Sequence, residues 1–237
     1  MHFLKGHWQL LLLITVIFLL WTTPVVLPLK FMIVYLHELS HGLAALLTGG
    51  SIVEISLSPQ QGGHAITRGG SRFLILSAGY VGSLVLGAGL LTIALRSEAD
   101  RFVVGLFGAV TLLVTGLYIR DLFPLAFCTL TGGGLLAMAR YLGHGANDLT
   151  LRIIGLASLL YVPYDIFDDT IARSGERSDA FLLSEEFGGP VMFWGGLWLV
   201  LSLAVVFLCL RYGIGPDSNI PLGRFSRTKE QRSSRSG

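Results

Sequence analysis

The sequence predicts an all-α polytopic membrane protein with one short β-hairpin. Of its 237 residues, 52% are hydrophobic and only 14% are charged, and the mean hydropathy is +0.68. Soluble domains average about 25% charged residues. Apolar stretches close to the ~20 residues that cross a bilayer recur along the chain, and residues 49–70 instead alternate apolar and polar positions. We therefore expect a multi-pass integral membrane protein.

Seven apolar stretches are candidate membrane spans. Pro24 and Pro28 interrupt the first long run, and Arg120-Asp121 leaves a short join farther on, because proline and charge favour helix breaks. Either join could belong to one kinked or re-entrant element, so we predict six or seven transmembrane helices. The stretches lie at about residues 8–28, 29–48, 73–95, 102–119, 122–142, 150–168 and 190–211.

A β-hairpin is predicted directly after the second stretch. Residues 49–58 alternate apolar and polar side chains, and residues 59–70 supply turn residues and a second alternating piece. Beside a membrane site, such a segment could pair with an extended substrate strand. It could equally be a surface hairpin with no role in substrate binding.

Small residues recur in the third stretch, at residues 77–83 and at Gly87 and Gly89. Small side chains let transmembrane helices approach closely. We therefore interpret this segment as a packing face rather than a chemical site.

The chain divides into a membrane domain, residues 1–212, and a disordered basic tail, residues 213–237. The N-terminus has the short basic region and apolar core of a signal peptide, but no cleavage site of small residues follows, which favours a retained first span. The tail combines arginines and a lysine with serines, glycines and prolines, a composition typical of disorder. Its basic character favours a cytoplasmic C-terminus.

Composition also narrows the range of partners. The net charge is only +2, and no basic patch interleaved with aromatic residues occurs in the body of the chain, so we expect no nucleic-acid partner. Cys128 and Cys209 both lie in apolar stretches and are interpreted as small buried side chains rather than a disulfide framework.

Three ionisable residues, His37, Glu38 and His41, lie inside the apolar run 31–47. Ionisable groups at membrane depth are costly, which makes a functional site their default interpretation. On a helix the two histidines share a face one turn apart and can bind one metal ion, and Glu38 can act on a water at that ion; this is the HExxH pattern of zinc hydrolases. We expect one catalytic Zn²⁺ per chain, because a structural site would use four ligands, typically including thiolates.

A catalytic zinc site needs a third protein ligand. Our first choice is Asp165, the most embedded of three aspartates at the end of an apolar helix, because Pro163 can bend that helix toward the site. Asp168 and Asp169 are alternatives from the same cluster. Asp179, in the loop before the last stretch, is a further alternative that requires the chain to fold back into the membrane.

Other possible ligands rank lower. His64 and His144 lie in glycine-rich segments typical of exposed loop histidines. A zinc site of the kind completed by a downstream glutamate would have to use Glu185-Glu186, which we place in a loop rather than on a helix.

Taken together, these motifs resemble the M50 family of site-2-protease-like metallopeptidases, and more narrowly its M50B-like branch. The resemblance runs from about residue 30 to 200. The motifs that carry it are His37-Glu-Leu-Ser-His41-Gly, Gly49-Gly50 with the hairpin, Ala78-Gly-Tyr-Val-Gly-Ser83, Tyr164-Asp-Ile-Phe-Asp-Asp169, Ser178-Asp179-Ala180, Trp194 and Trp198.

The resemblance implies an intramembrane zinc metalloprotease that hydrolyses peptide bonds in or near transmembrane segments, with membrane proteins as substrates and the lipid bilayer as its surroundings. It also implies zinc ligands His37, His41 and Asp165, with Glu38 as general base. Leu160 and Ile166 depart from the Asn-x-x-Pro and Leu-Asp-Gly elements of well-studied site-2 proteases. The oxyanion donor therefore stays open.

Two tyrosines, Tyr161 and Tyr164, are the candidates for that donor. The alternative function is a non-proteolytic membrane scaffold, chaperone or transporter-like protein on the same framework, since buried histidine and carboxylate pairs also serve proton and metal-ion transport.

Overall fold

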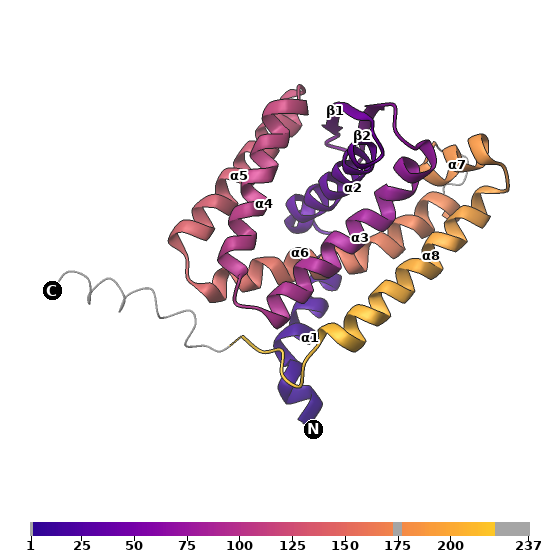
Figure 1. The fold of residues 1–237 in the computed structure, drawn as a ribbon. Coiled ribbons are helices and arrows are strands. Elements are labelled where there is room, and N and C mark those ends of the chain that lie inside the picture. The colour runs from indigo at the N-terminus through magenta and orange to yellow at the C-terminus, as the bar shows by residue number, and fades with distance from the viewer. Residues whose placement is uncertain (1, 173–176, 221–237) are drawn as a thin grey trace.

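The computed structural model describes residues 2–172 and 177–220, and most of this part of the chain is helical (Figure 1). Two strands form the one sheet that these residues contain. The elements in chain order are α1 (His2–Leu20), η1 (Pro24–Val26), α2 (Leu27–Leu47), β1 (Ser51–Leu57), β2 (Gly63–Arg68), α3 (Arg72–Arg96), α4 (Asp100–Tyr118), α5 (Leu122–Tyr141), α6 (His144–Phe167), η2 (Asp168–Ala172), α7 (Asp179–Phe187), α8 (Val191–Leu208) and η3 (Cys209–Gly213).

Among the described residues, five helices are long and apolar enough to cross a membrane: α3, α4, α5, α6 and α8. The stretches 8–28 and 29–48 form α1 and α2, which are bent by 115° at their break and add a sixth span when counted together. Pro24 and Pro28 stand at the starts of η1 and α2, where a residue without an N–H is tolerated. The prediction of a multi-pass membrane protein is confirmed. The described residues provide five spans, or six with the bent pair, where the sequence predicted six or seven.

α3 and α6 pack against each other at the centre of the bundle (Figure 1). Their backbones approach closely at two glycines: a Cβ at Gly155 would lie 2.8 Å from the Gly87 carbonyl oxygen. This contact confirms the packing role predicted for that part of the third stretch. α4 and α5 are separate helices that pack side by side, so Arg120-Asp121 is a turn between two spans.

The predicted β-hairpin is confirmed. β1 pairs antiparallel with β2, with Ser51 opposite Arg68 and Leu57 opposite Gly63. Ile55 and Leu57 of β1 are buried in a core cluster shared with α2. The Ser56 hydroxyl also donates to the Asp121 carboxylate in the α4–α5 turn, so the hairpin is fixed both to α2 and to this turn.

α6 begins at His144, six residues before the predicted stretch 150–168. The early turns contain Asp148 and Arg152, which are both buried and form an ion pair with 2.6 Å between Arg152 Nε and an Asp148 carboxylate oxygen. One turn of helix brings these opposite charges together. A hydropathy pattern that counts each charge separately therefore begins the span too late.

The described part of the predicted tail, residues 213–220, packs against α1. The Ser218 N–H donates to the Gly6 carbonyl at 2.8 Å, and the His7 ring and the Ser218 hydroxyl are 2.8 Å apart. The predicted disorder of residues 221–237 lies outside the described residues. Residues 213–220 themselves are part of the folded molecule.

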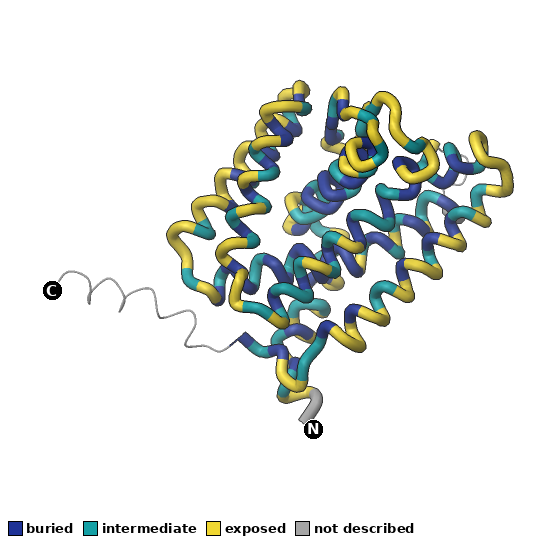
Figure 2. The backbone as a smooth tube through the Cα atoms, in the orientation of Figure 1, coloured by how far each residue is buried: buried dark blue, intermediate teal, exposed yellow. Residues whose placement is uncertain are grey.

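Large apolar side chains cover the outer faces of the bundle. In Figure 2 the outward sides of α4, α5 and α8 are largely exposed, and the exposed side chains there include Leu113, Leu130, Val200 and Phe207. An apolar surface of this extent marks an interaction site, and here the matching environment is hydrocarbon. The fold and its surface thus identify a multi-pass integral membrane protein.

Candidate metal centre

His37 and His41 lie one turn apart in the middle of α2. Their side chains are largely enclosed, with 17% and 8% of their surface exposed. The ring centroids are 4.8 Å apart and the ring planes are inclined at 72°. The helix therefore presents both imidazoles to the same small volume, as the sequence predicted.

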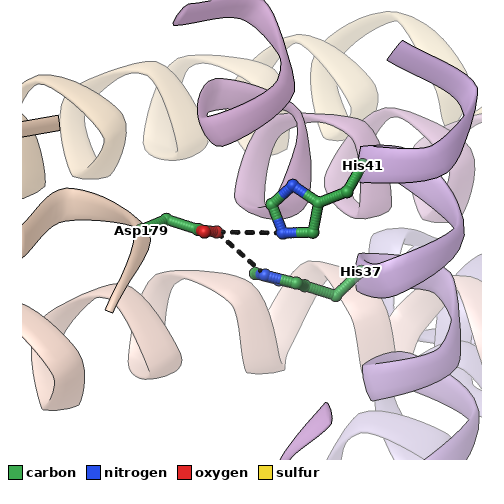
Figure 3. A group of neighbouring side chains, drawn as sticks. All are labelled: His37, His41 and Asp179. Carbon is green, nitrogen blue, oxygen red and sulfur yellow. Dashed lines mark hydrogen bonds and ion pairs between the residues drawn. The ribbon is translucent and has the colours of Figure 1, made fainter. Parts of the chain in front are cut away.

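Asp179, the first residue of α7, completes the group. Its Oδ2 atom lies 3.0 Å from Nε2 of His37 and 3.2 Å from Nε2 of His41, as Figure 3 shows. Ser178 caps α7, since its hydroxyl accepts a hydrogen bond from the Phe181 N–H at 3.3 Å. The cap fixes the start of the helix, and with it the position of the aspartate.

These three side chains form the group of histidine, cysteine and carboxylate residues, within residues 2–172 and 177–220, that could hold a metal ion. Their ligand atoms all lie within 4.8 Å of one another. Zinc bonds of ~2.0–2.1 Å in a tetrahedral arrangement place two ligand atoms roughly 3.3 Å apart. The measured separations from Asp179 to the two histidines are close to that value.

The hydrogen bond of His41 supports a cation in this place. Its Nδ1 lies 2.7 Å from the Ile75 carbonyl oxygen, which can only accept, so Nδ1 carries the proton. In neutral His41 the lone pair of Nε2 then points at a carboxylate oxygen, which is unfavourable unless a metal ion, or a second proton on the ring, lies between them. A second hydrogen bond that orients a ligand histidine in this way is typical of metal sites.

The electrostatics of Asp179 agree with a ligand role. Burial favours its neutral form, but the facing imidazoles of His41 and His37 outweigh that effect and hold the pKa of this carboxyl well below its usual range. Metal binding requires a deprotonated carboxylate. Asp179 is therefore held ionised beside its two histidines, and the ionised carboxylate is the form that a metal ion binds.

Glu38 is buried beside the histidines and faces the start of β2. A Cβ at Gly63 would lie 2.7 Å from a carboxylate oxygen of Glu38. Any side chain in place of Gly63 would therefore have to displace the Glu38 carboxylate. At Gly63 the hairpin therefore contacts the Glu38 carboxylate through backbone atoms alone.

α3 forms another wall of the site. A Cβ at Gly79 would lie 2.3 Å from His37 Nε2 and 2.6 Å from Asp179 Oδ2. The ring of Tyr80 stands edge-on to that of His37, with centroids 5.0 Å apart, and its hydroxyl donates to Asp169 at 2.7 Å. The third stretch therefore serves the site as well as helix packing, which the packing interpretation did not include.

The group opens into a cavity of about 720 Å³. Its walls come from the α1–α2 bend, the hairpin, α3, the end of α6 and the start of α7. Cavities of 300–1,000 Å³ are typical of small-molecule and substrate sites. The histidines, Glu38 and Asp179 thus face a volume that can admit a segment of another molecule.

The aspartate that lies with the two histidines is the alternative Asp179 and not Asp165, our first choice. Asp165 and Asp168 line the cavity, and Asp165 is close enough to His37 to interact with it electrostatically, but neither belongs to the ligand group. Asp169 also lines the cavity, and its carboxylate accepts a hydrogen bond from the Tyr80 hydroxyl. The reason lies in the topology. α7 follows η2 in the chain and packs against α3, and this packing places the Asp179 carboxylate in front of both histidines.

The lower-ranked residues lie elsewhere. His64 lies on β2 and lines the cavity, whereas His144 begins α6. Glu185 and Glu186 belong to α7, a helix that the sequence analysis placed in a loop, and they pair with Arg177 and Arg72. Neither histidine and neither glutamate belongs to the ligand group found among the described residues.

The tyrosines proposed as oxyanion donors, Tyr161 and Tyr164, both line the cavity. The parts played by Gly63, Gly79 and the α7 helix were not predicted from the sequence. The sequence does contain one indication of α7. Ser178 followed by Asp179 is a usual N-cap and first-turn signal of a helix.

The bundle and this site define a polytopic membrane protein with a buried histidine–histidine–aspartate centre. The chain matches the family of Peptidase M50B-like proteins over residues 10–209 and belongs to that family. M50 proteins are metallopeptidases, usually dependent on zinc. No curated protein and no solved structure matches the chain.

Proposed function

We propose that this protein is an intramembrane zinc metallopeptidase that hydrolyses peptide bonds in or near the transmembrane segments of other membrane proteins. The observation that carries the proposal is the convergence of His37, His41 and Asp179 on one point beside Glu38, at the wall of a cavity inside a helical membrane bundle. The family membership supports a peptidase framework.

In this proposal His37, His41 and Asp179 hold one Zn²⁺ ion. Bound there, zinc supplies Lewis-acid activation of a water molecule and of the scissile carbonyl group. Glu38 takes the proton of the attacking water as general base. It then passes that proton to the nitrogen of the leaving amine as general acid, so one carboxylate serves both proton transfers.

The substrate is proposed to be a membrane-spanning segment that unwinds at the site. In a helix the carbonyl groups are engaged in internal hydrogen bonds, and those bonds have to open before hydrolysis. Gly63 and His64 at the start of β2 line the cavity, and an extended substrate segment could lie beside this strand. Tyr161 and Tyr164 are the proposed donors to the oxyanion.

The test compares membrane-protein termini in cells that produce the wild-type chain or the Glu38→Gln variant, with zinc content measured on both purified proteins. We expect new peptide termini within transmembrane segments with the wild type alone, and equal zinc in both proteins. Identical termini with both proteins would contradict the peptidase proposal and favour the scaffold or transporter-like alternative.

A further inference from the structure

A groove separate from the metal centre lies between the N-terminal half of α1 and the segment formed by η3 and residues 214–217. α1 and the chain that follows α8 meet at the end of the molecule away from the hairpin and α7 (Figure 1). The groove has a volume of about 1000 Å³. Its apolar walls are formed by Leu11 and Ile14 on α1 and by Leu210 and Ile214 on the facing segment.

Two cations line this groove. Lys5 belongs to the N-terminal part of α1, and Arg211 belongs to η3. Asp217 also lines it, and its carboxylate accepts a hydrogen bond from the Asn219 N–H at 2.8 Å, within its own turn. The lining therefore combines an apolar wall with an excess of positive charge, which matches a ligand that has a hydrocarbon chain and an anionic head.

The facing wall is held in place by contacts to α1 and α3. The Asn219 side-chain amide donates to the Lys5 carbonyl at 2.7 Å, and Arg96 Nε donates to the Gly213 carbonyl at 2.8 Å. A Cβ at Gly6 would lie 2.8 Å from the Pro216 carbonyl oxygen, so this approach requires glycine. The groove is thus bounded on both sides by fixed backbone.

Two exposed aromatic residues indicate the depth of the cations in the membrane. Trp8, one helical turn from Lys5, is 51% exposed, and Tyr212, next to Arg211, is 66% exposed. Tryptophan and tyrosine are enriched at the membrane–water interface, at the level of the lipid headgroups. Lys5 and Arg211 are therefore expected at the same level, with the apolar wall toward the hydrocarbon.

We propose that this groove is a binding site for an anionic phospholipid of the surrounding bilayer. One acyl chain lies along the apolar wall, and the phosphate lies between Lys5 and Arg211. Basic pockets between transmembrane helices are known to hold anionic headgroups. The proposal commits to a bilayer lipid rather than a soluble anion, because most of the lining that faces the ligand is apolar.

The test is native mass spectrometry of the full-length protein in detergent, with phosphatidylglycerol or phosphatidylcholine of identical acyl chains added. We expect the wild type to retain phosphatidylglycerol preferentially. Lys5→Gln or Arg211→Gln should each weaken its binding roughly fivefold, and the double variant roughly thirtyfold. Phosphatidylcholine binding should change little.

Arg140→Gln is the matched control. Arg140 stands at the end of α5 beside Tyr141, with the same cation–aromatic contact that Arg211 makes with Tyr212, but it does not line the groove. This variant should keep the wild-type preference. Leu11→Trp, which fills the groove and leaves its charges, should reduce the retention of both lipids.

Three results would overturn the proposal. These are equal retention of the two lipids by the wild type, an unchanged preference in the double variant, and a loss of preference in Arg140→Gln as large as in the double variant. If the double variant unfolds, the comparison of Leu11→Trp with the wild type decides in its place, and unchanged retention of both lipids counts against the groove.

Discussion

The backbone of Gly79 on α3 faces the imidazole of His37 so closely that a methyl group there would lie 2.3 Å from the ring nitrogen Nε2. The same methyl group would lie 2.6 Å from the Asp179 carboxylate. Two of the proposed zinc ligands therefore occupy space that a side chain at this position would fill. The missing side chain of Gly79 is a structural requirement of the centre.

Replacing Gly79 with alanine is expected to displace His37 or Asp179 and to weaken zinc binding about 10- to 100-fold, the range found when the surroundings of a ligand are disturbed. The measurement is a competition titration with a zinc chelator. Gly89→Ala is the control on the same helix, because a Cβ there meets nothing within 4 Å. Equal zinc affinity in the two variants would show that the close approach does not constrain the site.

Asp179→Asn should reduce zinc affinity by more than the roughly 100-fold that loss of an outer partner causes, since a ligand charge is removed. Asp165→Asn should keep zinc, because Asp165 lies outside the ligand group. Zinc titrations of both purified variants make the comparison. The opposite ranking would restore Asp165 as the third ligand.

Gly63→Ala is expected to lower the rate of peptide hydrolysis about 100-fold and to leave zinc bound, because it moves the Glu38 carboxylate by about 1 Å without touching the ligands. Gly62→Ala is the matched control, since a Cβ at Gly62 meets nothing within 4 Å. Zinc content and cleavage are measured on the same preparations. Full activity of Gly63→Ala would mean that Glu38 tolerates the displacement and that its position is not critical.

Tyr80 gives a test of ligand positioning in two steps. Tyr80→Phe removes the hydrogen bond to Asp169, keeps the ring against His37, and should cost about 1 kcal/mol of stability with zinc affinity nearly unchanged. Tyr80→Leu removes the ring edge as well and should weaken zinc binding roughly tenfold. Thermal unfolding and zinc titration separate the two effects. Equal zinc affinity in Tyr80→Leu and the wild type would exclude an orienting role for the ring.

The fold class could be predicted from the sequence because it follows from local patterns. Hydropathy indicates the spans, alternation indicates the hairpin, and spacing places His37 and His41 on one helical face. The early start of α6 could not be read in this way, since Asp148 and Arg152 reduce hydropathy until the helix pairs them. The 115° bend between α1 and α2 likewise depends on packing that proline positions alone do not determine.

The third member of the candidate site depends on long-range topology. Asp179 is separated from His37 by 142 residues, and the short α7 helix has to fold back on α3 to bring it there. From hydropathy, Asp165 was the more embedded aspartate, yet depth in an apolar stretch does not say which way the chain turns after it. The glycines that make room for Glu38 and His37 are equally invisible until the neighbouring elements are in place.

The most direct test of the central claim is a zinc-edge X-ray absorption spectrum of the purified wild-type chain and of the His37→Ala variant. We predict one zinc ion per wild-type chain, with nitrogen and oxygen neighbours at ~2.0–2.1 Å, scattering from two imidazole rings, and loss of the metal in the variant. A wild-type chain that carries no zinc, or zinc with sulfur neighbours at ~2.3 Å, would contradict a centre built from His37, His41 and Asp179.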